Sequence, residues 1–191
     1  MESVLPRSLV TIATKPVLEI ADFDAVADVC RPVIFRFVLA LLRDRDAAET
    51  ITQECLLKAY EARGDFRGEG SVRGWMMRIA VNMARNHLRN ARLKFWRRTQ
   101  RQGIDASFAA DWLGDGKESP EELTAARQRV TAVWNAAANL PDRQRIVFLL
   151  RFGEDMELAE IAAATQMQVG TVKSHLFRAV NAVRERIEET R

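Results

Sequence analysis

Five side chains near the C-terminal end of the chain have the chemistry needed to read double-stranded DNA. They are Thr171, Lys173, Ser174, Phe177 and Arg178. Arginine can bond a guanine through two hydrogen bonds, serine and threonine can bond bases or phosphates, and phenylalanine can touch a thymine methyl group. An ordinary solvated helix face is the alternative interpretation of the same residues. The element that carries them decides between the two.

These residues lie in a pattern of two short helices joined by a tight turn, which reads EIAAATQMQVGTVKSHLFRAVNAV over residues 160–183. The first helix has Ile161 and Ala162 on its apolar side. The apolar positions of the second recur at helical spacing: Val172, Leu176, Ala179 and Val183. This is a helix-turn-helix, whose second helix enters the major groove with its N-terminal residues. His175 lies near the same surface, where a solvent-facing histidine is the simpler interpretation.

A second region combines aromatic rings with positive charge. From Arg67 to Arg101 there are ten Lys or Arg residues against one acid, Glu69. Bases of single-stranded DNA stack on aromatic rings at roughly 1–3 kcal/mol each, while cations follow the backbone. Phe66 and Trp75 have suitable rings, although both are equally compatible with a place in the core. The best candidates for phosphate contact share a helical face: Arg78, Arg85, Arg89 and Arg92.

The composition predicts an all-α protein, because Gly and Pro are sparse and alternating β-branched residues are almost absent. The first helix is expected over about 23–42, with an apolar stripe of Val26, Val29, Val33, Phe37 and Leu41. Pro32 either kinks this helix or marks its true start. The second is expected to begin at Asp46 as N-cap, with Glu49 reaching back, and to run to about Arg63. Its inward face is Ile51, Cys55 and Leu56. The third follows the loop 64–71 and passes Arg92, with Trp75, Ile79 and Met83 on one side.

An acidic, glycine-containing segment separates two halves of the chain. Residues 103–122 hold six acids and three glycines against Lys117 alone. The segment ends at Ser119 and Pro120, where Ser can cap a helix and Pro suits its first position. We therefore expect two small helical domains, 22–101 and 119–191, joined by an acidic flexible linker over 102–118. Residues 1–21 form an N-terminal extension, either disordered or in contact with a regulator.

Several classes of protein and site are disfavoured by the sequence. Cys30 and Cys55 lie far apart without a CxxC spacing, and the two histidines complete no metal-ligand cluster, so buried reduced thiols are expected. No phosphate-binding glycine loop and no nucleophile with a partner histidine is visible. We expect no enzyme activity, metal, cofactor or small-molecule substrate. The longest N-terminal apolar run is too short to span a bilayer, which favours a cytoplasmic protein.

Three segments in order resemble the sigma-70 family of bacterial RNA polymerase initiation factors, in its extracytoplasmic-function (ECF) group. The segment AAETITQECLLKAYE (47–61) is similar to the helix that grips core polymerase. FRGEGSVRGWMMRIAVNMARNHLR (66–89) is similar to the segment that opens and holds the minus-10 element. LPDRQRIVFLLRF (140–152), followed by the helix-turn-helix, is similar to the domain that reads the minus-35 element.

The resemblance implies three sets of site residues. Contact with core polymerase falls on Glu49, Gln53 and Glu54. Contact with the melted minus-10 element falls on Phe66, Arg67, Trp75, Arg78, Asn82, Arg85 and Arg89, around a base pocket at the loop 64–71. Minus-35 reading falls on the five candidates named first. The implied partners are core polymerase (clamp and flap regions), promoter DNA in duplex and melted form, and an anti-sigma factor.

Two positions depart from the family pattern, and two other functions remain open. Thr50 stands where a second acid often follows Glu49. Gln166 occupies a turn position that is often Gly, so either a side chain tolerates an unusual backbone there or the turn is shaped differently. The first alternative is an operator-binding regulator, because TVKSHL also resembles the recognition helix of response-regulator output domains. The second is a protein-binding helical adaptor, against which salt-dependent DNA binding would argue.

Overall fold

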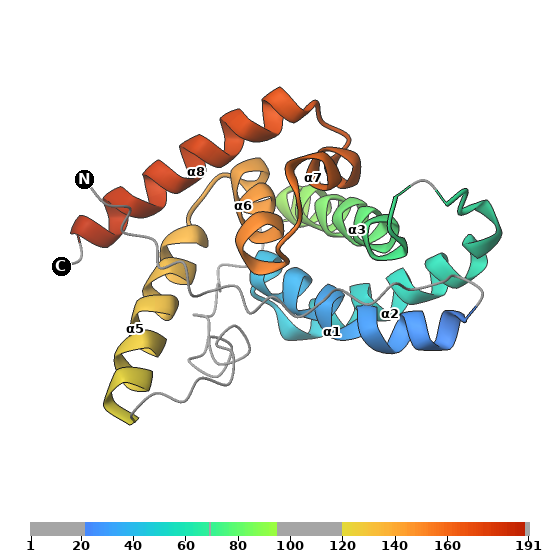
Figure 1. Cartoon of the computed structure of the whole chain (residues 1–191), viewed down its shortest axis with the longest axis horizontal. Helices are drawn as coiled ribbons and strands as arrows, with labels where there is room; N and C mark the ends of the chain where they lie inside the picture. The colour runs from blue at the N-terminus through green and yellow to red at the C-terminus, as the bar shows by residue number, and fades with distance from the viewer. Residues whose placement is uncertain (1–21, 69, 95–119, 190–191) are drawn as a thin grey trace.

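The computed structural model describes residues 22–68, 70–94 and 120–189, and every regular element within them is a helix (Figure 1). The expected extension 1–21, the linker 102–118 and the Ser119 cap lie outside these ranges. The elements in chain order are α1 (Phe23–Leu42), α2 (Arg45–Glu61), a 3₁₀ turn (Arg63–Asp65), α3 (Val72–Lys94), α5 (Pro120–Ala137), α6 (Asp142–Phe148), a π-helical turn (Leu149–Gly153), α7 (Leu158–Thr165) and α8 (Val169–Glu189). The prediction of an all-α protein is confirmed.

The N-terminal half is a bundle of α1, α2 and α3, each of which packs against the other two. The expected bounds of α1 and α3 are confirmed, and Pro32 lies inside α1 rather than at its start. The expected N-cap of α2 is wrong. Asp44 caps the helix, because its extended backbone lets the carboxylate accept a hydrogen bond from the Ala47 amide at 3.0 Å.

The buried face of α1 differs from the expected stripe at two positions. The fully buried side chains include Val26, Cys30, Ile34, Phe37 and Leu41, whereas Val29 is 37 % exposed. After Val26 the buried stripe steps by four residues to Cys30 and again to Ile34, so Val29 falls on the solvent side and Val33 is only half-buried. In α2, Ile51 and Cys55 are buried as expected and Leu56 is half-buried. The residues expected on one side of α3, namely Trp75, Ile79 and Met83, are half-buried and pack on the core.

The C-terminal half consists of α5 to α8. Trp134 of α5 meets Phe148 of α6 edge to face, with ring centroids 5.8 Å apart, and Phe148 meets Phe152 of the π-helical turn at 4.7 Å. Buried Arg145 donates a hydrogen bond to the Ala138 carbonyl at 3.0 Å, which ties α6 to the end of α5. This aromatic cluster fixes α6, on which α8 lies.

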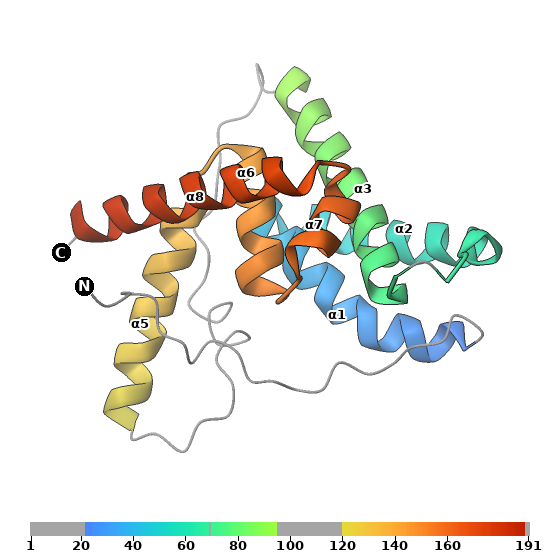
Figure 2. The same cartoon turned by 45° about the horizontal axis from the view of Figure 1, so that its top comes forward.

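The two halves are in direct contact. Figures 1 and 2 both show α7 beside α3, and the π-helical turn also meets α1. The apolar core is continuous from α1 through α3 to α7 and α8. Contact with α7 therefore covers part of α3, the helix that carries most of the basic candidates. None of the described helices is long and apolar enough to cross a membrane.

Candidate nucleic-acid interface

The helix-turn-helix predicted over residues 160–183 is present as α7, a turn and α8. A reciprocal capping box joins Glu157 and Glu160 and starts α7, with the Glu157 amide donating to the Glu160 carboxylate at 2.9 Å. Gln166 ends α7 in the left-handed region, at φ +58° and ψ +37°. Of the two alternatives expected at Gln166, the unusual backbone is the one observed. It reverses the chain without glycine and sets the direction in which α8 leaves the turn.

The apolar positions of α8 face the core as predicted. Val172, Ala179 and Val183 are buried and Leu176 is half-buried. The opposite side of the helix is open to solvent.

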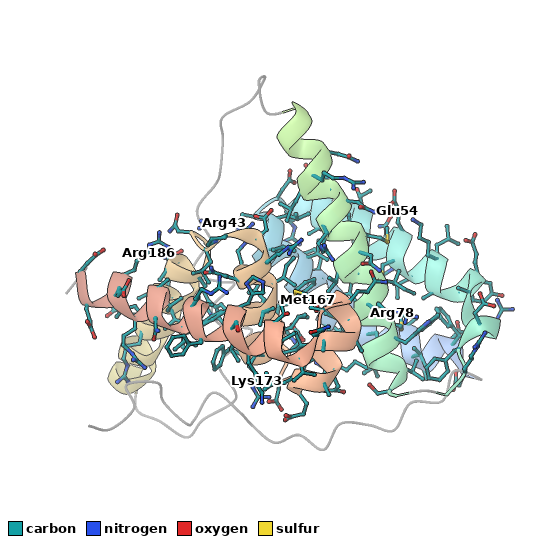
Figure 3. The ribbon with its side chains drawn as sticks, turned by 90° about the horizontal axis from the view of Figure 1, so that it is seen from above. Arg43, Glu54, Arg78, Met167, Lys173 and Arg186 are labelled. Atoms are coloured by element: carbon teal, nitrogen blue, oxygen red, sulfur yellow. The ribbon has the colours of Figure 1, made fainter. Side chains whose placement is uncertain are left out.

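All five minus-35 candidates are exposed on α8: Thr171, Lys173, Ser174, Phe177 and Arg178. Phe177 is 67 % exposed, the largest value among the exposed large apolar side chains of the described residues. The Ser174 hydroxyl donates to the Gly170 carbonyl at 3.0 Å, which leaves its oxygen able to accept. Figure 3 shows Lys173 pointing outward from α8. An exposed ring beside two cations suits contact with bases and phosphates rather than with water.

His175 is half-buried rather than solvent-facing. Burial lowers the pKa of its imidazole, and the positive charges of Arg178 and Arg143 lower it further. Within the described part of the chain, its Nδ1 is buried without a hydrogen-bond partner. The lowered pKa favours the neutral form of this imidazole, close to the positive charges of Arg178 and Arg143.

The aromatic candidates of the minus-10 set pack against each other. The ring centroids of Phe66 and Trp75 are 5.7 Å apart, and both rings are half-buried against the core. Phe66 follows the 3₁₀ turn and Trp75 lies in the first turn of α3, so the two residues flank the loop between these elements, where Gly68 and Gly70 adopt positive φ values of 73° and 85°. Most side chains cannot adopt this backbone without strain, so the glycines shape the loop.

The basic candidates differ in exposure. Arg67, Arg78 and Arg89 are exposed, Asn82 is half-buried, and the side chain of Arg92 lies outside the described residues. Half-buried Arg85 donates to the Thr165 carbonyl of α7 at 3.3 Å, so this proposed phosphate contact is directed into the other half. A small cavity at that junction is lined by residues that include Arg85, Thr165 and Met167. Met167 is labelled in Figure 3.

The polymerase-binding candidates lie on the open face of α2. Glu49, Gln53 and Glu54 are exposed, and Glu49 pairs with Arg45 at 3.1 Å rather than closing a capping box. Two apolar side chains that sequence reasoning did not select adjoin them: Leu57, 58 % exposed, and Tyr60, 46 % exposed. Leu57 and Tyr60 lie one and two helical turns after Gln53, and this spacing could have placed them on the same face of α2 from the sequence.

The sequence patterns also did not identify Glu154, a buried acidic residue that pairs with two arginines. Glu154 follows the π-helical turn, and its side chain is fully buried. Arg36 of α1 donates to both carboxylate oxygens, from Nε at 3.3 Å and from Nη2 at 3.0 Å. Arg73 of α3 donates from Nη2 to the carboxylate at 3.2 Å and to the Glu154 carbonyl at 3.0 Å. Burial raises the pKa of the Glu154 carboxyl, and the two guanidiniums partly offset this.

Two family descriptions match the chain. "Sigma-70 region 2" matches residues 27–102, and "Sigma-70, region 4" matches residues 131–183. Together they cover more than half of the chain. The first contains α2, the glycine loop and α3, and the second contains the aromatic cluster and the helix-turn-helix.

Relatives and a solved structure agree with these matches. RNA polymerase sigma-H factor of Pseudomonas aeruginosa is 33 % identical over 154 residues, which cover 78 % of each chain. ECF RNA polymerase sigma-E factor of Escherichia coli is 34 % identical over 142 residues, which cover 72 % of each. The sigma factor RpoE of Bartonella quintana, solved in complex with the anti-sigma factor NepR, has a similar fold with a TM-score of 0.68 at 20 % identity, over 89 % of this chain and 99 % of that one. The chain belongs to the sigma-70 family of RNA polymerase initiation factors, in its ECF group.

Proposed function

We propose that α8 reads the minus-35 promoter element through Thr171, Lys173, Ser174, Phe177 and Arg178. The observation that carries this proposal is the exposed ring of Phe177 beside Arg178 on a helix whose opposite face is buried. Arg178 provides the base-specific contact, and Thr171 and Lys173 suit phosphates. We assign this reading to a domain over residues 119–191.

The minus-10 element contacts a domain over residues 22–101. Arg67, Arg78 and Arg89 are exposed cations for the phosphates of the melted strand, with Arg85 and Asn82 beside them. Phe66 and Trp75 are half-buried on either side of the glycine loop, and their rings are suited to hold an unpaired base there. Binding the exposed strand supplies the free energy for melting.

Core polymerase docks on α2. Glu49, Gln53 and Glu54 offer a polar, acidic face, and the adjoining side chains of Leu57 and Tyr60 supply the apolar area that such an interface needs. The C-terminal domain contacts the flap region of the same polymerase. The protein acts in the cytoplasm and has no catalytic activity of its own.

An anti-sigma factor holds the protein inactive. The support for this proposal is the fold shared with RpoE of Bartonella quintana, which was solved with an anti-sigma factor bound.

The test is start-site mapping of transcripts made by bacterial core polymerase plus this protein on fragmented genomic DNA. Arg178→Ala removes one bidentate base contact, about 1–3 kcal/mol, so specific starts fall roughly 5- to 150-fold. Arg184→Ala is the matched control, because Arg184 is exposed on the same helix outside the reading set. Equal start patterns from both variants would refute the assigned reader, and no starts from active polymerase and folded protein would refute the proposed function.

A further inference from the structure

We call the arrangement with α7 packed against α3 the closed molecule. We propose that Arg36 and Arg73 form an anion site that Glu154 occupies in the closed molecule. A phosphate of the melted promoter strand takes the place of Glu154 when the two halves separate. This inference rests on the proposed function. The Arg36–Arg73 site adds a phosphate contact to the set assigned above. Glu154 competes with the phosphate for this site.

The geometry of the site suits an oxyanion. Two guanidinium groups from different helices converge on one carboxylate, and Arg36 binds it through both oxygens. Arginine forks bind carboxylate and phosphate in the same bidentate manner. The two arginine side chains are 24 % and 21 % exposed while the carboxylate is fully buried, so the site opens to solvent once Glu154 leaves.

The position of the site favours promoter DNA as the second occupant. Arg73 lies in the first turn of α3, two residues before Trp75 and directly after the glycine loop proposed to hold an unpaired base. The strand that enters this loop carries its phosphates past the same helix end. Arg78 and Arg89 continue the positive charge along α3.

Promoter reading requires the two halves to separate. The minus-10 and minus-35 elements are about 25 base pairs apart, or roughly 85 Å at 3.4 Å per base pair. In the closed molecule α3 contacts α7, and Arg85 bonds Thr165. The two halves therefore cannot occupy both elements until the contacts of Glu154 with Arg36 and Arg73 are broken. About 25 residues connect α3 to α5, and an extended chain of that length reaches about 80–90 Å.

The experiment compares full-length variants for compactness, by small-angle X-ray scattering, and for binding of a fluorescent single-stranded DNA of mixed sequence. Glu154→Gln keeps the shape of the side chain and removes the charge that Arg36 and Arg73 hold. Glu185→Gln is the matched control, an exposed acid of α8. Arg73→Gln breaks the closed contact and also removes half of the anion site, and Arg31→Gln, an exposed cation of α1, controls for lost charge. Circular dichroism checks that each variant retains its helices.

We expect Glu154→Gln to increase the radius of gyration and to tighten the binding of single-stranded DNA. The gain in affinity is about tenfold if roughly nine-tenths of the unbound molecules are in the closed form. The slope of log affinity against log salt steepens by about 0.7 for each phosphate newly contacted. Arg73→Gln also expands the molecule but gains less affinity than Glu154→Gln, because opening releases Arg85 from Thr165 while half of the anion site is lost. The double variant Glu154→Gln, Arg73→Gln binds no tighter than Arg73→Gln alone. The two controls behave as the original protein.

Three results would overturn the proposal: Glu154→Gln indistinguishable from Glu185→Gln, a double variant that binds as tightly as Glu154→Gln alone, or no single-stranded binding by any variant at low salt. Transcription with core polymerase is measured in parallel. Specific starts together with any of these results would remove the anion site and leave the proposed function intact.

Discussion

Replacing Gln166 by glycine should stabilise the protein, because the backbone of the helix-turn-helix holds this residue at φ +58°. An L-residue in the left-handed region costs roughly 1–2 kcal/mol. Glycine adopts this region freely but loses about 0.5–1 kcal/mol of additional backbone entropy on folding. Gln166 is exposed, so few side-chain contacts are lost. The net expectation for Gln166→Gly is a gain of about 0.5–1 kcal/mol in the free energy of unfolding.

The assay is equilibrium urea unfolding followed by circular dichroism, with thermal melting as a second measure. For a chain of this size the gain corresponds to a rise of about 1–4 °C in Tm. Gln128→Gly is the matched control, because Gln128 is exposed within α5 and the same substitution there should cost about 1 kcal/mol. Gln166→Asn should fall between the original protein and Gln166→Gly, since asparagine tolerates positive φ. Destabilisation by Gln166→Gly to the extent of Gln128→Gly would show that the backbone argument is wrong.

Two further predictions concern the first half of the chain. Burial raises the pKa of the Cys30 thiol to about 11 and that of Cys55 to about 12, so iodoacetamide at pH 8 should modify neither in the folded protein and both in urea. Since these folded-state pKa values exceed the ordinary 9.0, the unfolded thiols ionise first and the free energy of unfolding falls as pH rises from 9 toward 11. Rapid labelling of folded protein, read by mass spectrometry, would contradict their burial. Asp44→Ala should cost about 1 kcal/mol in urea unfolding, as the loss of a helix N-cap, whereas Asp46→Ala should cost about 0.3 kcal/mol. A larger loss of stability from Asp46→Ala than from Asp44→Ala would show that Asp46 is the N-cap.

The sequence predicted the helices well because their signals are local. Apolar spacing located α1, α3 and the helix-turn-helix. The family pattern, which often has glycine at the position of Gln166, left open an unusual backbone or a differently shaped turn there, and the backbone is left-handed. The error at the cap of α2 has a local cause as well. Asp44 and Asp46 are both acceptable caps by type, and only the extended backbone of Asp44 decides between them.

The parts of the site that the sequence could not predict depend on contacts between distant segments. Glu154 lies 118 positions from Arg36 and 81 from Arg73, and no periodicity links the three. The same holds for Arg85, which the helical pattern placed with the exposed arginines but which the structure turns toward Thr165. Exposure of Leu57 and Tyr60 follows from which face of α2 meets α1 and α3, and this is a property of the packed bundle.

The closed arrangement affects the three proposed interfaces unequally, which bears on the order of assembly. The polar face of α2 and the proposed reading face of α8 are open in the closed molecule, whereas Arg73 and Arg85 of α3 are bonded to the C-terminal half. Polymerase can therefore dock on α2, and α8 can meet duplex DNA, before the halves separate. We infer that contact of the C-terminal half with a distant minus-35 element or with polymerase then draws α7 away from α3, which would make the two arginines available to the melted strand. Without the Glu154 carboxylate, the site holds two cations, Arg36 and Arg73, close together. An incoming phosphate gains the interaction with them that Glu154 gives up. Replacing Glu154 by phosphate therefore costs less free energy than separating the two halves with the site left empty.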